Sequence, residues 1–309
     1  MGRAGSRGGV RAAAAVVLLA AVSTGVAACG SAAGSTGPGT VRVVASTDVW
    51  GDVASAVGGR HAEVTSIITD PSADPHEYEA SARTRLAVSR ADVVVENGGG
   101  YDDFMHRLLS APGTTATVID AVDVSGQAAR AKAAGRELNE HVWYDFPSVG
   151  KVADRIAAAL AKEDPADAGA FQANATAFRS RLQQLMDREN ADRATTEGAP
   201  VAITEPVPLY LLDALGAVNR TPAAFSKAVE EGDDVPVTVL RRTTALFSDH
   251  AVKALVYNAQ TADPQTALLK KAAQDASVPV VPVTETLPAG KSYLQWMTDN
   301  LTAISGALS

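Results

Sequence analysis

Cysteine is almost absent from the sequence: the 309 residues contain only Cys29. A single cysteine cannot form an intramolecular disulfide, so no covalent cross-link within the chain stabilises the fold. A structural zinc site built from several thiolates is excluded for the same reason. Any metal site in the folded part of the chain must therefore use histidine, aspartate, glutamate and backbone oxygen.

Aromatic rings and positive charges are also scarce. Phe, Trp and Tyr make up 5% of the chain, and 35 acidic residues outnumber 27 Lys and Arg, which gives a formal net charge of −8. A nucleic-acid-binding surface is usually basic and offers rings for base stacking. We therefore expect no nucleic-acid partner. The hydrophobic content of 46% is instead typical of a globular protein.

The N-terminus has the pattern of a secreted protein. Three arginines precede the apolar stretch 12–22, which is too short to span a bilayer as a helix. Small residues then lead into Cys29, and this Val-Ala-Ala-Cys sequence resembles the lipobox at which bacterial lipoproteins are cleaved and acylated on sulfur. An ordinary signal peptide with an incidental cysteine is the alternative. We predict that residues 1–28 are removed and that residues 29–40, rich in Gly and Ser, form a flexible tether.

The rest of the chain alternates between short apolar runs and helical segments. The run 91–96 (ADVVVE) is continuously apolar before its final residue, as expected of a buried parallel strand. This alternation predicts an α/β fold with mostly parallel sheets. We expect an N-terminal lobe at 41–164, a linking helix at 165–196 and a C-terminal lobe at 197–309. Within the second lobe, residues 221–236 are predicted to be an irregular connection.

Two of the five histidines have settings that favour ligand binding. His76 lies in a Pro-containing loop after the predicted strand 62–68, and the carboxyl ends of parallel strands form the ligand crevice of α/β folds. His141 lies just before a predicted helix, with Trp143 close enough in sequence to shield it from water. The other histidines, His61, His106 and His250, are predicted to lie at the surface.

The segments around these two histidines, DPHEY at 74–78 and NEHVWYD at 139–145, resemble a known family. They are similar to the metal-binding segments of the cluster A-I solute-binding lipoproteins of zinc and manganese ABC importers. The resemblance implies two Rossmann-like lobes joined by one long helix. It also implies a binding protein rather than an enzyme: a monomer that is held outside the cell membrane by lipid on Cys29 and passes Mn²⁺ or Zn²⁺ to permease and ATPase subunits.

The resemblance also implies four metal ligands: His76, His141, Glu205 and Glu285. The position of Glu205 is usually histidine in the zinc branch of the family and glutamate in the manganese branch. Glu285 stands where the family usually has aspartate, so Asp263 and Asp299 are alternatives for this ligand. Two imidazoles and two carboxylates would permit manganese without excluding zinc.

Three polar residues near the histidines are candidates for the shell around the ligands. Asp74, Asn139 and Asp145 could accept hydrogen bonds from the ring N–H groups of His76 and His141. The same residue types are common in turns and at helix caps, where their side chains bond to the backbone instead. The sequence leaves both interpretations open.

Other functions compete with a receptor for an importer. A zinc hydrolase would need an open metal position and a general base, and the sequence has no H-E-x-x-H or H-x-x-E-H element. A metallochaperone for another exported protein would use the same ligands. An adhesin is the third alternative, although no repeat or large aromatic patch supports it.

The lipobox generates the first prediction. Cys29→Ala should release the protein from the membrane without lowering its melting temperature, because the tether contributes no core residue near this position. Membrane fractionation with detection of lipid on the protein tests this. A variant that remains in the membrane fraction as a lipid-modified species would show that the anchor lies elsewhere.

Overall fold

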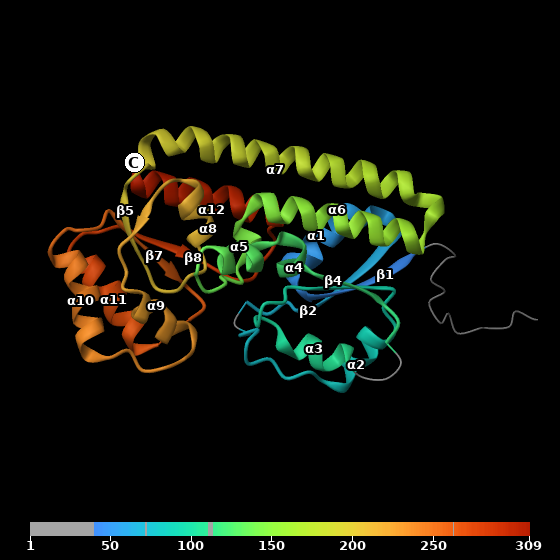
Figure 1. Ribbon diagram of the computed structural model, residues 1–309, viewed down its shortest axis with the longest axis horizontal. Coiled ribbons are helices and arrows are strands. Elements are labelled where there is room, and N and C mark those ends of the chain that lie inside the picture. Colours follow the sequence, from blue (N-terminus) through green and yellow to red (C-terminus); the bar gives the residue numbers. More distant parts are fainter. Residues whose placement is uncertain (1–39, 72, 111–113, 262) are drawn as a thin grey trace, which may run out of the picture. The chain divides into compact units, whose positions relative to one another are not determined.

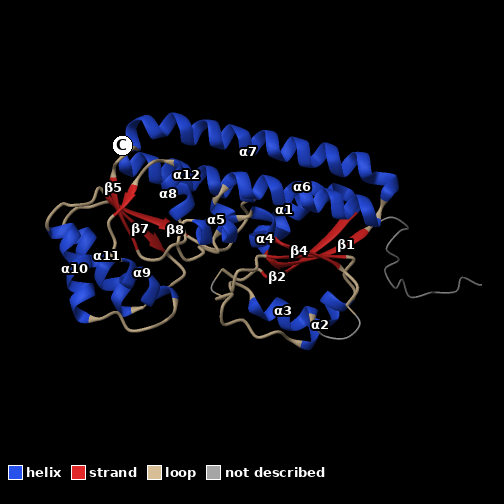
Figure 2. Ribbon diagram, in the orientation of Figure 1, coloured by secondary structure: helices blue, strands red, loops and turns tan. Residues whose placement is uncertain are grey.

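The computed structural model of the protein describes residues 40–71, 73–110, 114–261 and 263–309. The predicted leader, Cys29 and the tether up to residue 39 lie outside the described residues. The described part contains two four-stranded sheets in which every strand pairing is parallel. Helices cover both faces of each sheet (Figures 1 and 2). The predicted α/β fold is therefore confirmed.

The first sheet has the strand order β2-β1-β3-β4. Its strands are β1 (Val41–Thr47), β2 (Ala62–Ile68), β3 (Val93–Glu96) and β4 (Thr117–Asp120). The connecting helices are α1 (Asp48–Gly58), α2 (Ala82–Ser89) and α3 (Asp103–Leu109), followed after β4 by α4 (Ala121–Ser125) and α5 (Gln127–Ala133). The three valines of β3 are completely buried because helices cover this strand on both faces.

The second sheet repeats this order as β6-β5-β7-β8. Its strands are β5 (Pro200–Ile203), β6 (Val218–Asn219), β7 (Ala254–Asn258) and β8 (Val280–Val283). Its helices are α8 (Leu209–Ala214), α9 (Ala223–Glu230), α10 (Val237–Ser248), α11 (Pro264–Asp275) and α12 (Tyr293–Leu308). In each sheet the first strand of the lobe, β1 or β5, is an inner strand, the second strand lies at one edge, and the third and fourth lie on the other side of the first. In such α/β sheets a ligand crevice forms at the carboxyl ends of the strands, where the strand order reverses.

The two sheets share one layer of long helices. The helix α7 (Ala168–Thr196) has 29 residues, about 44 Å of helix, and follows α6 (Phe146–Glu163). Figure 1 shows α7 running beside α6 and α12 above both sheets. Phe171, Phe178 and Leu182 lie on its buried face. The predicted long helix between the lobes is therefore confirmed.

One hydrophobic core extends through both lobes beneath this helix layer. It includes Val43 of β1, Phe178 of α7, Val201 of β5 and Trp296 of α12. Hydrogen bonds join the lobes as well: the Tyr293 hydroxyl donates to the Trp143 carbonyl oxygen at 2.6 Å. The lobes are thus connected by packed side chains and not only by the covalent chain.

The segment 221–236 differs from the prediction. It was expected to be irregular, but it contains α9, in which Phe225 and Val229 are buried four residues apart on one helical face. Pro222 precedes the first helical residue and so begins the helix. The short strand β6 was not predicted either.

No helix among the described residues has the length and apolar character needed to cross a membrane.

The buried face of α7 contains one carboxylate, Glu189, whose exposure is 6%. Burial, together with the negative charge of Asp145, raises the pKa of Glu189 from 4.5 to about 8. The folded state therefore binds a proton here more tightly than the unfolded state does. The stability associated with this proton is present below pH 4.5 and is lost as the pH rises through about 8.

Glu189→Gln should remove this pH dependence, because Gln cannot ionise. We expect the variant to gain stability relative to the wild type as the pH rises from 4.5 to 8, by at most about 1.4 kcal/mol per pH unit. Urea unfolding at pH 5 and pH 8.5, with metal removed, measures the difference. Equal changes at both pH values would contradict this role.

Candidate metal centre

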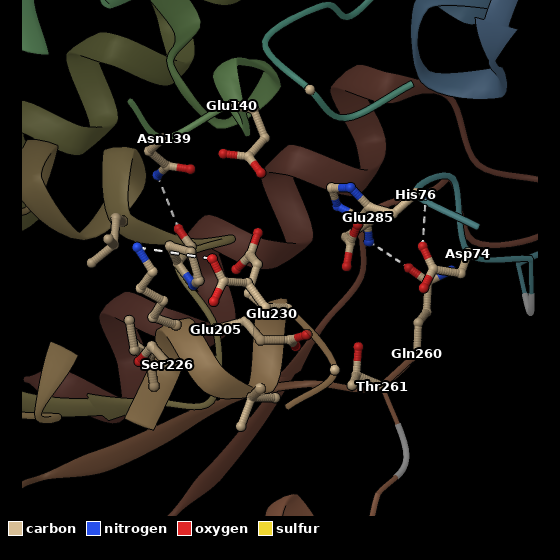
Figure 3. Close-up of a pocket in the computed structure, with 18 of the residues that line it drawn as sticks. Asp74, His76, Asn139, Glu140, Glu205, Ser226, Glu230, Gln260, Thr261 and Glu285 are labelled. Atoms are coloured by element: carbon tan, nitrogen blue, oxygen red, sulfur yellow. Dashed lines mark hydrogen bonds and ion pairs between the residues drawn. The ribbon is translucent and has the colours of Figure 1, made fainter. Parts of the chain in front are cut away.

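A cavity of about 970 Å³ lies where the carboxyl ends of the strands of both lobes face each other. Five residues predicted from the sequence line it: Asp74, His76, Asn139, Glu205 and Glu285. Figure 3 shows their side chains around one central space, together with Glu140 and Glu230. The loop after β2 provides His76, the segment after β5 provides Glu205, and the segment after β8 provides Glu285.

His76 is held by its own loop and by an aromatic ring. Its backbone N–H donates to Asp74 Oδ1 at 2.8 Å, so Asp74 fixes the turn of the chain rather than the imidazole. The His76 ring meets the Tyr101 ring edge-on, with 5.1 Å between centroids. The imidazole nitrogens of His76 thus remain directed at the cavity that the residue lines.

His141 is buried behind the cavity, with 1% of its surface exposed. Its Nδ1 lies 2.7 Å from Asn139 Oδ1, and the Asn139 amide nitrogen donates to the Pro206 carbonyl oxygen at 3.0 Å. The second bond fixes which amide atom is oxygen, so Nδ1 must carry the proton and Nε2 must present a lone pair. His141 Nε2 has no hydrogen-bond partner among the described residues.

The surroundings of His141 keep this imidazole neutral. Burial, together with the neighbouring His76, lowers the pKa of His141 to about 3. The ring packs edge-on against Trp143 with 5.1 Å between centroids, and Tyr101 lies at 6.0 Å on the way to His76. A neutral, oriented imidazole with a free lone pair is the form that binds a metal ion.

Glu205 and Glu285 are buried carboxylates, with exposures of 5% and 9%. Burial raises the pKa of Glu205 to about 7. Burial and then the charge of Glu205 raise the pKa of Glu285 to about 8. Glu285 Oε1 accepts a hydrogen bond from Asn258 Nδ2 at 2.7 Å, whereas Glu205 Oε2 has no partner among the described residues. Both residues line the cavity, and neither forms an ion pair with a lysine or arginine among the described residues.

Three other sequence candidates are engaged elsewhere. Asp145 accepts hydrogen bonds from Gln127 Nε2 at 2.8 Å and from Ser148 Oγ, so it braces the start of α6 and not a histidine ring. Asp263 caps α11, where its Oδ1 accepts from two backbone N–H groups at 2.6 and 3.0 Å. Asp299 pairs with Lys291 at 2.5 Å on the surface.

The sequence interpretation missed Glu140 and Glu230, two carboxylates of the cavity that lie close to His76. Among the described residues, His76, Glu140 and Glu230 form the group whose possible ligand atoms all lie within 4.8 Å of one another. Glu230 Oε1 is also 3.5 Å from His141 Nε2. Glu140 stands beside His141 in the quoted segment, so its proximity could have been noticed. Glu230 ends α9, the helix that was not predicted.

The site brings several largely buried carboxyl groups together. Burial raises the pKa of Glu230 strongly, and the charges of Glu140, Glu205 and Glu285 add to this effect. A divalent cation would reverse the effect, because it replaces repulsion between carboxylates with attraction. Imidazole nitrogen and carboxylate oxygen are donors that both zinc and manganese accept. The residues therefore suit a divalent transition metal ion.

Comparison with known proteins identifies the family of the chain. Residues 43–307 match the model of the family described as zinc-uptake complex component A, periplasmic. The chain belongs to this family. The manganese-binding lipoprotein MntA of Halalkalibacterium halodurans is 30% identical over 205 residues, which cover 65% of this chain and 66% of that protein. MntA of Bacillus subtilis is 32% identical over 161 residues, which cover 51% and 52%. The chain thus matches between half and two thirds of the length of these relatives.

Solved structures share the architecture over nearly the whole described part. The periplasmic zinc binding protein TroA of Treponema pallidum superposes with a TM-score of 0.72 at 18% identity, over 88% of this chain and 100% of that one. The Pseudomonas aeruginosa protein FpvC in complex with Mn²⁺ gives 0.71 at 23% identity, over 87% and 98%. At these identities the likeness establishes the fold of the family.

Proposed function

We propose that this protein is an extracytoplasmic receptor that captures Mn²⁺ or Zn²⁺ and delivers the ion to an ABC importer. The observation that carries the proposal is the His141 imidazole, whose buried Nε2 lone pair faces a cavity lined by unpartnered carboxylate oxygens. A buried acceptor without a donor costs stability, and a bound cation would remove that cost. The names of the MntA relatives, which are manganese-binding lipoproteins, support it.

In this proposal His76 and His141 of the first lobe bind the ion together with Glu205 and Glu285 of the second. Two carboxylates supply the charge of −2 that balances a divalent ion. Each can bind through one or two oxygens, which allows the coordination number above four that manganese prefers. In this proposal the site binds and releases an ion and catalyses no reaction.

The position in the cell follows from the leader. Residues 1–28 would be removed, lipid on Cys29 would anchor the protein to the outer face of the cell membrane, and residues 29–40 would form the tether. A monomer would then present the cavity to the permease, whose ATPase partner drives import. The core shared by the two lobes limits hinge bending, so we expect only a small closure when metal binds.

Loss of either histidine should weaken metal binding. We expect His76→Ala and His141→Ala each to lower the affinity for Mn²⁺ and Zn²⁺ at least about tenfold, or about 1.4 kcal/mol, because each variant loses one nitrogen donor. Titration calorimetry on protein stripped with chelator measures this. His250→Ala, a change on a loop outside the cavity, is the matched control. Wild-type affinity in both site variants would exclude this site.

Loss of either carboxylate should affect manganese more than zinc. Glu205→Gln and Glu285→Gln keep the size of the side chain but remove one negative charge, and Mn²⁺ depends more on hard oxygen donors. We expect the metal-induced rise in melting temperature to shrink in both variants, most with Mn²⁺. Glu205→His should move the preference toward zinc. An unchanged rise with both metals in Glu285→Gln would remove Glu285 from the ligand set.

Import itself requires a separate measurement. Uptake of radioactive ⁵⁴Mn²⁺ and ⁶⁵Zn²⁺ by cells that lack this protein, with and without the permease, distinguishes a receptor from a metallochaperone. A receptor should restore uptake only where the permease is present. Restoration of a metal-dependent exported enzyme without any change in uptake would favour the metallochaperone instead.

A further inference from the structure

Glu230 lies where a negative charge is unfavourable for the fold. It is the last residue of α9, and the carboxyl end of a helix carries partial negative charge that repels an anion. Its side chain is only 15% exposed, and both of its carboxylate oxygens lack a hydrogen-bond partner among the described residues. Such a position costs stability unless something positive binds there.

No lysine or arginine offsets this charge in the described ion pairs. Lys227, one turn earlier on α9, pairs with Glu137 at 2.9 Å and with Glu231 at 3.8 Å. Glu230 Oε1 lies 3.5 Å from His141 Nε2, and the neutral imidazole presents a lone pair there and not a proton. Its other close neighbour is the Glu140 carboxyl, which brings no positive charge. When Glu230 is ionised, two acceptors therefore face each other across 3.5 Å.

The separation of these two atoms fits a shared ion. Nitrogen and oxygen ligands lie about 2.0–2.2 Å from a metal ion, so two neighbouring ligands about 90° to 110° apart are separated by about 2.8–3.6 Å. His141 Nε2 and Glu230 Oε1 are 3.5 Å apart. A second, independent relation includes the same residue, since possible ligand atoms of His76, Glu140 and Glu230 lie within 4.8 Å of one another.

We propose that Glu230 is a further metal ligand, which binds the same ion as His76 and His141 through a carboxylate oxygen. Figure 3 shows Glu230 directed at the cavity from its helix in the second lobe, opposite the loop of His76. This inference rests on the proposed function of the site and adds a carboxylate that the four-residue set does not contain. Glu140 is not assigned as a ligand, because it lies close to His76 and Glu230 but forms no contact with His141 among the described interactions.

A third carboxylate would change which ion the cavity prefers. Five protein ligands, two of nitrogen and three of oxygen, exceed the four positions of tetrahedral zinc but suit a manganese ion of higher coordination number. The net ligand charge of −3 would also favour retention of a strongly charged, hard cation. Glu230 is thus a residue that selects Mn²⁺ over Zn²⁺.

The test compares Glu230→Gln with the wild type in titrations with Mn²⁺, followed by the EPR signal of the free ion, and with Zn²⁺, followed by competition with a coloured chelator. We expect the Mn²⁺ affinity to fall at least about tenfold and the Zn²⁺ affinity to fall by a smaller factor. X-ray absorption of the Mn²⁺ complex should show one oxygen ligand fewer. Glu197→Gln removes an equal charge from a surface ion pair with Arg193 and should behave as the wild type.

Glu230→Asp separates coordination from a general effect of charge. It keeps the negative charge but withdraws it by one methylene, so a direct ligand should be lost and the Mn²⁺ affinity should fall as in Glu230→Gln. A normal affinity in Glu230→Asp with a loss in Glu230→Gln would show a field effect and overturn the proposal. The melting temperature without metal should stay close to that of the wild type in Glu230→Gln, because the amide has nearly the same size and shape as the carboxyl group; this shows that the variant is folded.

Failure of this inference differs from failure of the site as a whole. If Glu230→Gln binds Mn²⁺ as tightly as Glu197→Gln while His76→Ala and His141→Ala lose binding, the site stands and Glu230 is not a ligand. If the histidine variants also bind normally, the metal centre proposed above is wrong.

Discussion

The hydrophobic core that the two lobes share is the constraint on which the metal centre depends. The chain has no disulfide to hold its parts, so packing must fix the two sheets relative to each other. Residues of β1, α7, β5 and α12 belong to one buried cluster. A cavity whose donors come from both lobes keeps its geometry only because the backbones that carry those donors cannot drift apart.

Several acidic groups line the cavity, and the lysine that lines it with them, Lys227, is paired with Glu137 and Glu231. Burial raises the pKa values of Glu205, Glu230 and Glu285, so ionisation of these carboxyl groups is unfavourable in the fold without a cation. A bound divalent cation would favour the ionised forms, which then attract it. The affinity for a cation would therefore depend on the same groups that are costly to ionise in its absence.

The sequence predicted the parts of the fold whose signals are long or repeated. The continuous apolar run of β3 and the one-sided apolar face of α7 could be recognised without tertiary information. The helix α9 was missed because it is short and shows only one apolar pair, Phe225 and Val229, between turn residues. Glu230 was missed with it, since its place in the cavity depends on how that helix packs.

The direction of a side chain was the second feature that the sequence could not predict. His76 and Glu205 follow strands, and the topology of a parallel sheet brings strand ends together, so both could be placed at the cavity. Asp145 is four residues from His141 but accepts hydrogen bonds from Gln127 and Ser148, because the start of α6 turns its side chain away. Proximity along the chain could not reveal this difference in direction.

Asn139 connects the two lobes, because it forms hydrogen bonds both to the His141 imidazole and to the segment that carries Glu205. Its side-chain oxygen holds His141 Nδ1, its amide nitrogen holds the Pro206 carbonyl next to Glu205, and its own carbonyl accepts from the Tyr210 hydroxyl at 2.7 Å. The orientation of an imidazole in one lobe is therefore coupled to the position of the segment next to Glu205 in the other lobe. Any change in the separation of the lobes would have to break or shift these hydrogen bonds.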